Sequence, residues 1–574
     1  MHTRFYSFIV GILFCLHVIS APVDKNTARD IAECFILNKL GTGGLTDANM
    51  PYEAKRRFAV SDNGAPAFHV FNVGNNDGYV IVSGDDSFPE IIGYSTDGAF
   101  DENMSMPDGL ICFLESYSAY VSDVRQGLAE PPVMELSEGS SAVAPLCAAE
   151  WGQGAPFDDF IPEDNGAVCP VGCVATSMAQ IMYKWKFPER PKPLKVSYNT
   201  QNWNIGVIVE DFSTDEHIYE WELMKPKANG NVISSSRKAV SRLSYDCGVA
   251  TKMQYTSAGS GAYDEDALIA YYRYFSYDAS SLELVFRECV DSEEEWTNII
   301  KRELDEGRPV HFSASSPEGE GRDAAGHAFV IDGYDNNGLV HVNWGWYGSY
   351  NGYYQLSVLD VGAYRFSDLQ TVIIGIEPGT GEEKPKQYRL YAENAPAVYE
   401  DVVNRGDLFN VNLDGVYNIS LYPHEWSYGI GLFDKKGDFV CNVDVRKGNN
   451  KVELNGGYGF EDDVVCALPD DCADGNYMLR LVCKEKGYED WVLPNCMGGD
   501  KLNSIPLWVT ENELRFNQVS SSLSDVFADG QKTASSECFD MVGRKILSPV
   551  RGAPYVERYV REDGTSFSIK KIKR

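Results

Sequence analysis

Two short segments without helical or strand periodicity divide this chain. Residues 129–145, ending in PPVMELSEGSSAVAP, mix proline, serine and glycine, and residues 378–386 (PGTGEEKPK) have a similar composition. A chain of 574 residues is too long for one hydrophobic core, so breaks between folding units are expected. The first segment also has the exposed character of a site that proteases cut.

Each unit between these breaks has its own pattern. Residues 24–128 contain two helical patterns with short strands between them, such as FHVFNVG and YVIVSGDD, which predicts a small α/β unit. Residues 146–378 place helices first and short strands from Val310 onward, which predicts an α+β domain with an antiparallel sheet. Residues 387–510 carry short strands separated by turns, which predicts a β-sandwich of immunoglobulin-like type. Residues 520–574 form a carboxy-terminal tail.

Residues 1–20 have the parts of a secretory signal. A weakly basic start precedes an apolar run over residues 8–19, and Val18 and Ser20 fit the small-residue rule for cleavage after Ser20. No later stretch of the sequence approaches the ~18 apolar residues of a membrane span. The sequence therefore predicts a protein that is secreted or held at the cell surface, without a membrane span.

Charge and cysteine spacing exclude some classes of function. The formal net charge of -34 argues against a nucleic-acid partner, because phosphate binding needs a basic face. Fourteen cysteines permit disulfides in an oxidising compartment, but none form a C-x-x-C pair and the eight histidines are scattered. We therefore expect no metal site and no cofactor.

One cysteine has a position that favours chemistry. Cys173 opens a predicted helix over residues 172–186 and follows Pro170 and Gly172. The N–H groups at a helix start favour a thiolate and can donate to an oxyanion. A buried cysteine is more often a small hydrophobic residue, so the position of Cys173 at the helix start is what favours a nucleophile.

A cysteine nucleophile needs a histidine base from another element. His327 lies in the apolar strand GHAFVIDGY, where a hydrogen-bonded core histidine is the alternative interpretation. The segment HVNWGW follows nearby. If its strand pairs with the His327 strand, Asn343 can accept from the imidazole and fix its tautomer, and Trp344 can cover that bond.

The motifs GCVATSMAQIMYKW, WGQGAPF, GHAFVIDGY and HVNWGW resemble the streptopain family of bacterial cysteine proteases. The resemblance covers roughly residues 144–378, and residues 24–128 resemble the propeptide of that family. It implies a papain-like catalytic fold, endopeptidase activity on protein or peptide substrates, and inhibition by the chain's own propeptide. The tail MVGRKI…YVREDGTSFSIKKIKR resembles the carboxy-terminal sorting regions of proteins exported by Bacteroidetes-type bacteria.

The same resemblance implies roles for individual residues. The expected catalytic group contains the nucleophile, the base, an oxyanion donor and a supporting pair, in this order: Cys173, His327, Gln153, Asn343 and Trp344. The expected substrate cleft is lined by Gly326, Ser260 and Gly261.

Two other functions fit parts of the sequence. A Cys-His cell-wall amidase also places its cysteine at a helix start, and an adhesin would use the β-sandwich beside an inert protease-like domain. Gln153 upstream of the cysteine and the long pro-like unit favour the protease. Cys169, four residues before Cys173, is either a bystander or an oxidation partner.

Overall fold

The computed structural model describes most of the first two units and separate parts of the third. The described residues are 20–40, 44–48, 65–101, 104–132, 141–228, 232–315, 326–356, 370–381, 386–392, 394–413, 415–418, 424–445, 449–452, 456–459, 463–496, 499, 503–516, 533–539, 545–546, 554–561 and 566–572. The signal sequence predicted up to Ser20 lies outside these ranges, apart from Ser20 itself.

The amino-terminal unit has the predicted mixture of helix and strand. Its helices are α1 (Lys25–Leu40) and α3 (Asp108–Gln126), and its strands are β1 (Leu45–Asp47), β2 (Phe68–Val73), β3 (Tyr79–Ser83) and β4 (Ile91–Ser95). All neighbouring strands in this group pair antiparallel. Helix α3 buries a nearly continuous apolar face and ends at Gly127, whose φ of 69° suits a left-handed cap.

The central unit places helices before an antiparallel sheet, as predicted. Its helices are α4 (Cys173–Trp185), α5 (Ser234–Ala250), α6 (Asp264–Arg273) and α7 (Glu293–Asp305). Its main strands are β11 (Glu283–Phe286), β12 (Val310–Ser315), β13 (Gly326–Tyr334), β14 (Val340–Asn343), β15 (Gly352–Tyr354) and β16 (Thr371–Ile374). Hairpins form from β5 (Glu163–Asp164) and β6 (Ala167–Val168), β7 (Lys195–Asn199) and β8 (Val207–Asp211), and β9 (Gln254–Thr256) and β10 (Gly259–Gly261).

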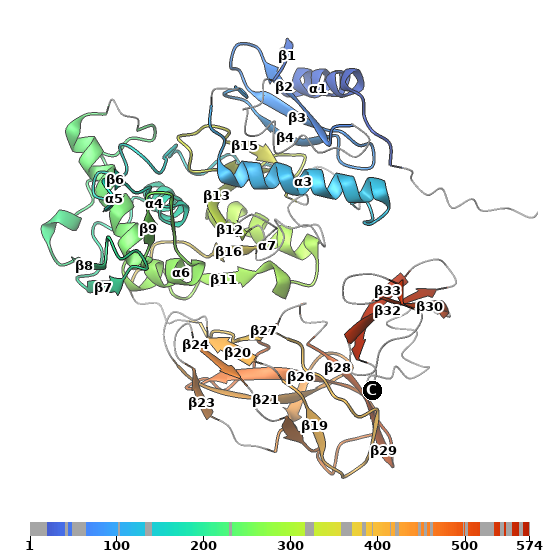
Figure 1. Cartoon of the computed structure of the whole chain (residues 1–574). Helices are drawn as coiled ribbons and strands as arrows, with labels where there is room; N and C mark the ends of the chain where they lie inside the picture. The colour runs from blue at the N-terminus through green and yellow to red at the C-terminus, as the bar shows by residue number, and fades with distance from the viewer. Residues whose placement is uncertain are drawn as a thin grey trace, which may run out of the picture.

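The two units share one sheet of ten strands, in the order β1-β2-β3-β4-β15-β14-β13-β12-β16-β11. Strand β4 joins β15 through the pairs Tyr94↔Tyr353 and Gly93↔Tyr354. A Cβ on Gly93 would lie 2.8 Å from the Tyr354 ring, so the junction requires a glycine there. Figure 1 shows the amino-terminal unit (blue) continuing directly into the central one (green to yellow).

Strand β13 lies at the centre of the core. On one face Ala328 and Val330 belong to the cluster that contains the buried side of α4. On the other face Phe329 and Ile331 pack in a cluster with α3 and α7. Burial on both faces explains why this strand reads as a continuous apolar run rather than as an alternating pattern.

Within its described residues, the carboxy-terminal unit is built mainly of strands, as predicted. They are β17 (Tyr391–Ala392), β18 (Val402–Asn404), β19 (Phe409–Val411), β20 (Gly415–Asn418), β21 (His424–Asp434), β22 (Phe439–Asn442), β23 (Asn449–Val452), β24 (Gly456–Gly459), β25 (Val464–Cys466), β26 (Gly475–Glu485), β27 (Asn495–Cys496), β28 (Ile505–Val509) and β29 (Glu513–Phe516). Sheets β24-β20-β17-β27 and β18-β29-β28-β26-β21-β22 contribute to one core, which the central unit shares.

This unit is docked on the central one beside β11, where the Tyr391 ring packs against Phe286 at 4.9 Å between centroids. The tail residues form a further sheet in the order β31-β30-β32-β33, from β30 (Thr533–Phe539), β31 (Lys545–Ile546), β32 (Pro554–Arg561) and β33 (Ser566–Ile572).

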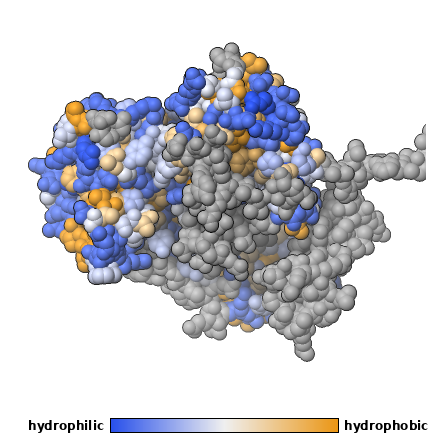
Figure 2. Space-filling model, turned by 45° about the horizontal axis from the view of Figure 1, so that its top comes forward, coloured by the Kyte–Doolittle hydropathy of each residue, from blue (hydrophilic) through white to orange (hydrophobic). Residues whose placement is uncertain are grey.

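The helices of the described ranges bear on the prediction of no membrane span. None of the helices there has both the length and the apolar character that crossing a membrane requires. On the coloured part of the face in Figure 2, polar residues predominate and apolar residues form only small patches.

Candidate active site

Cys173 is the first residue of α4. Gly172 precedes it as the helix cap, with a φ of 93° that favours glycine. A Cβ on Gly172 would also lie 2.7 Å from the Met253 side chain and 3.1 Å from the Ser260 carbonyl oxygen. The positive φ and the lack of room for a Cβ therefore both require a glycine at this position. The glycine cap places the Cys173 thiol at the positive end of the helix dipole.

His327 is the second residue of β13, and its imidazole lies close enough to the Cys173 thiol for each group to shift the pKa of the other. Burial alone raises the pKa of that thiol, but the hydrogen bond and charge of His327 bring it below its ordinary value. Burial lowers the pKa of His327, whereas Cys173, Asp108 and the Trp344 carbonyl together raise it by more, so the net shift is upward. Both shifts favour a thiolate paired with an imidazolium, the reactive state of a cysteine nucleophile.

The second contact of the imidazole differs from the prediction for Asn343. His327 Nε2 lies 3.4 Å from the Trp344 carbonyl oxygen. The Asn343 amide instead donates to the Ala149 carbonyl at 2.6 Å, and its oxygen accepts from the Gly345 N–H at 3.2 Å. Asn343 thereby holds the turn that carries the Trp344 carbonyl.

Sheet register explains this difference. Strands β13 and β14 pair as predicted, but Asn343 lies opposite Val330. Val330 is three residues beyond His327, and side chains alternate between the faces of a strand. The side chains of Asn343 and His327 therefore project from opposite faces of the sheet.

Trp344 lies beside the imidazole, as expected. Its side chain is 1% exposed and packs against Phe329 and Tyr354, with centroid distances of 4.8 and 5.2 Å. The indole and the imidazole both border Gly109, where an added Cβ would be within 2.8 Å of each ring. Trp344 thus shields one side of His327 from water.

Gln153 is brought next to the segment that precedes the nucleophile. Its carbonyl oxygen accepts from the Val171 N–H at 2.9 Å, two residues before Cys173. Ser260 and Gly261 of β10 lie alongside Gly172, and the position of a Cβ on Gly261 faces open space. Gly326 is exposed at the start of β13, directly before His327. All eight residues predicted for the site therefore lie around the start of α4 and the adjoining ends of β13 and β14.

Sequence reasoning did not identify two further residues at the site. Gly109 and Asp108 open helix α3 of the amino-terminal unit, and a Cβ on Gly109 would lie 2.6 Å from His327 Cδ2. The charge of Asp108 also contributes to the raised pKa of His327. No local signal marks these residues, since a glycine and an acidic residue are ordinary in the first turn of a helix.

Cys169 does not share the environment of Cys173. Its side chain is fully buried, and burial raises the pKa of its thiol. Neither cysteine is in a disulfide. Cys169 therefore remains a neutral thiol in the core, which favours the bystander interpretation.

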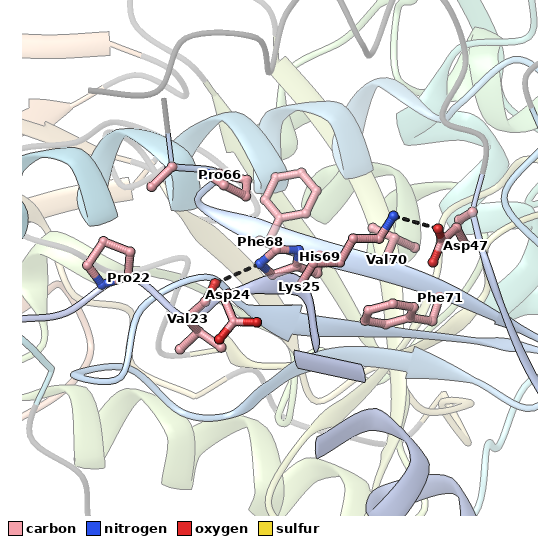
Figure 3. Close-up of a pocket in the computed structure, with 12 residues that line it drawn as sticks. Pro22, Val23, Asp24, Lys25, Asp47, Pro66, Phe68, His69, Val70 and Phe71 are labelled. Atoms are coloured by element: carbon pink, nitrogen blue, oxygen red, sulfur yellow. Dashed lines mark hydrogen bonds and ion pairs between the residues drawn. The ribbon is translucent and has the colours of Figure 1, made fainter. Parts of the chain in front are cut away.

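A pocket of about 540 Å³ lies elsewhere, in the amino-terminal unit. Figure 3 shows its lining from the start of α1 and from β1 and β2, with His69 Nε2 on the Val23 carbonyl at 2.9 Å and an ion pair between Lys25 and Asp47. It contains no nucleophile beside a base, so the Cys173 region is the candidate active site.

Two family models match the chain. The model of the Peptidase C10 family matches residues 151–354, which contain all eight predicted site residues. The model of the Spi protease inhibitor matches residues 20–121, which contain Gly109 and Asp108. The inhibitor match therefore covers the helix whose first turn lies on His327.

Similar proteins cover the same two regions. The thiol protease/hemagglutinin PrtT of Porphyromonas gingivalis is 32% identical over 65% of this chain, which spans 44% of PrtT. Streptopain of Streptococcus pyogenes is 31% identical over 60% of this chain and 85% of its own length. Among solved structures, a mutant fragment of Prevotella intermedia prointerpain A matches 58% of this chain and 99% of its own, with 28% identity and a TM-score of 0.48.

Proposed function

Since the chain belongs to the Peptidase C10 family of cysteine proteases, we propose that it is a secreted endopeptidase made as a zymogen. Cys173 is the nucleophile of this proposal and His327 its general base. The observation that carries it is the approach of the two side chains at the start of α4, with the thiol pKa lowered and the imidazole pKa raised. Substrates are proteins or peptides in extended conformation.

The first half of the reaction forms an acyl-enzyme. The Cys173 thiolate attacks the carbonyl carbon of the peptide bond, and the negative charge moves to the carbonyl oxygen. The Cys173 N–H and the side-chain amide of Gln153 donate to that oxygen. When the C–N bond breaks, the His327 imidazolium gives its proton to the departing amine, which leaves a thioester on Cys173.

The second half returns the enzyme to its starting state. Neutral His327 takes a proton from water, and the resulting hydroxide attacks the thioester carbonyl. The C–S bond breaks, and the peptide acid departs while the thiolate–imidazolium pair re-forms. The Trp344 carbonyl 3.4 Å from Nε2 supports this role, because it fixes the ring orientation through both halves.

Substrate reaches the thiol along the surface near Gly326, Ser260 and Gly261. The open space at the Cβ position of Gly261 and the exposure of Gly326 support a cleft there. These glycines allow a substrate backbone to approach closely.

The amino-terminal unit keeps the enzyme latent in this proposal. The match to an inhibitor family and the contact of Gly109 with both His327 and Trp344 support occlusion of the site. Cys173 and His327 already shift each other's pKa in the full chain, which supports latency by covering the pair. Cleavage between the two units within residues 129–145 would allow activation.

Hydrolysis of azocasein by the processed enzyme, with a reductant present, tests the proposal. We expect iodoacetamide to abolish it and Cys173→Ala to lower it by about 10⁴-fold or more. The matched control is Cys169→Ala, which removes the buried thiol four residues away and should leave the rate unchanged. Residual activity of Cys173→Ala above background would contradict the assignment of the nucleophile.

The same assay separates the other two candidate functions. A cell-wall amidase would leave azocasein intact while releasing peptides from peptidoglycan. An adhesin with an inert protease-like domain would hydrolyse neither, and its thiol would not be alkylated at neutral pH.

A further inference from the structure

The loop that carries Gln153 is held by hydrogen bonds on both sides. Upstream, the Trp151 N–H donates to Gln180 Oε1 of helix α4 at 3.3 Å. The Gln153 carbonyl accepts from the Val171 N–H at 2.9 Å, which fixes the loop to the segment that leads into Cys173. These two bonds hold the loop against α4 and against the segment before Cys173, but neither involves Gly152 or Gly154.

Tyr347 contacts both of those glycines. Its hydroxyl oxygen accepts from the Gly154 N–H at 2.9 Å. A Cβ on Gly152 would lie 2.5 Å from the Tyr347 ring, and one on Gly154 would lie 2.8 Å from the hydroxyl. Glycine on either side of Gln153 therefore leaves the room that the Tyr347 side chain occupies.

The backbone of Tyr347 is held in a conformation that tyrosine rarely adopts. Its φ is 57°, in the left-handed region that favours glycine. The Tyr347 N–H donates to the Trp151 carbonyl at 3.0 Å, so the ring and the backbone are anchored to the same loop. Burial raises the pKa of the Tyr347 phenol, which keeps the hydroxyl neutral. A tyrosine in a backbone conformation that favours glycine indicates that its side chain has a local role.

We propose that Tyr347 is a positioning residue that holds the Gly152–Gln153–Gly154 loop so that the Gln153 amide meets the developing oxyanion. The inference rests on the proposed role of Gln153. Tyr347 does not touch the reacting atoms; it acts through the loop. Its ring prevents the loop from moving towards β14, and its hydroxyl fixes the peptide directly after Gln153.

The test compares variants in the processed enzyme. Tyr347→Phe removes only the hydroxyl and should lower kcat about fivefold, the rate equivalent of one neutral hydrogen bond, with KM nearly unchanged. Tyr347→Gly suits the backbone conformation and removes the ring, so it should approach the ~10²–10³-fold loss expected for Gln153→Ala. In the Gln153→Ala background, Tyr347→Phe should change kcat by less than about twofold, because its effect passes through Gln153.

The matched control is Tyr183→Phe, which removes a hydroxyl that bonds the Met224 carbonyl and leaves a ring packed on Trp151. It should leave kcat unchanged. If Gln153→Ala lowers kcat but Tyr347→Phe adds its full loss in that background, the positioning role is overturned. If Gln153→Ala itself retains normal kcat, the proposed role of Gln153 fails instead. The rate of Cys173 alkylation at neutral pH should be the same in all these variants, since the thiolate does not depend on the loop.

Discussion

At the scale of single residues, the reactivity of Cys173 is set by neighbours from three elements. The start of α4 supplies backbone N–H groups, β13 supplies the imidazole, and the turn after β14 supplies the carbonyl that orients it. Asp264 at the start of α6 opposes them, because its charge raises the pKa of the thiol. The net shift of the Cys173 pKa is still downward, so the contributions of His327 and the Ala328 backbone together exceed the combined effect of burial and Asp264.

The pKa shifts predict a bell-shaped pH profile for the processed enzyme. The thiolate forms as pH rises through the lowered pKa of Cys173, and the imidazolium is lost as pH rises through the raised pKa of His327. The acid limb of kcat/KM should therefore lie below about 8.5, the ordinary thiol value, and the alkaline limb above about 6.5, the ordinary histidine value. Steady-state kinetics across this range measures both limbs.

Inactivation by iodoacetamide gives an independent reading of the acid limb. Its rate should follow the same limb as kcat/KM, because both need the thiolate. A rate that rises only near pH 9, as for an unperturbed thiol, would contradict the ion pair.

At the scale of elements, helix α3 connects the amino-terminal unit to the proposed catalytic pair, Cys173 and His327. Its buried side chains share a cluster with Phe329, Trp344 and Tyr354 of the central unit. The Phe113 and Tyr354 rings meet edge to face with centroids 5.4 Å apart. This packing fixes the helix so that its first turn lies on His327.

Gly109→Ala should loosen this contact in the full-length chain. Alanine normally stabilises a helix interior by about 0.5–1 kcal/mol relative to glycine, so the substitution should not destabilise the helix itself. The added Cβ would lie 2.6 Å from His327 Cδ2, which requires the helix to move away. Overpacking of this kind costs ~1–3 kcal/mol, and we expect Cys173 in the unprocessed chain to be alkylated about tenfold faster.

Peptide mapping of the purified full-length chain reads alkylation at Cys173 itself, because other accessible free cysteines, such as Cys34, also react. Ala119→Val on the same helix is the control, because it adds volume at a partly exposed position away from His327. Equal alkylation rates in wild type and Gly109→Ala would mean that α3 does not cover the thiol.

At the scale of the whole molecule, the end of the first linker and the residues after it belong structurally to the central unit. Val143 and Tyr334 exchange backbone hydrogen bonds of 2.9 Å, and the Leu146 N–H donates to the Asp332 carbonyl at 2.9 Å. The Asp332 carboxylate accepts from the Cys147 N–H at 2.8 Å and is itself fully buried. A backbone held in this way is a poor substrate, because a protease needs it extended and free.

Maturation should therefore cut upstream of Val143. The prediction from sequence placed the cut within residues 131–145, and the hydrogen bonds of Val143 and Leu146 favour its earlier part. Mass spectrometry of the processed enzyme identifies the new amino terminus, which we expect at or before Ser141. Cys173→Ala should stay at full length if processing is autocatalytic. A terminus beyond Pro145, or inside residues 65–128, would contradict this prediction.

The sequence by itself determined the local elements and predicted the pair that we propose to react. The order of helices and antiparallel strands in the central unit follows from hydrophobic periodicity, which depends on neighbours a few residues apart. Cys173 was identifiable because its surroundings, a glycine cap and a helix start, are encoded within the same segment. His327 was a candidate from its own strand, and the family resemblance added Gln153, whose motif is equally local.

Tertiary structure alone decided which groups meet at the site. Asn343 lies opposite Val330, and that register places it on the far face from His327, because one residue of shift moves a side chain across the sheet. Gly109 reaches His327 only because β4 pairs with β15 and extends one sheet through both units. Tyr347 contacts Gly154 of the Gln153 loop, 193 residues away in sequence. Such contacts depend on long-range packing, for which residue patterns along the chain carry no signal.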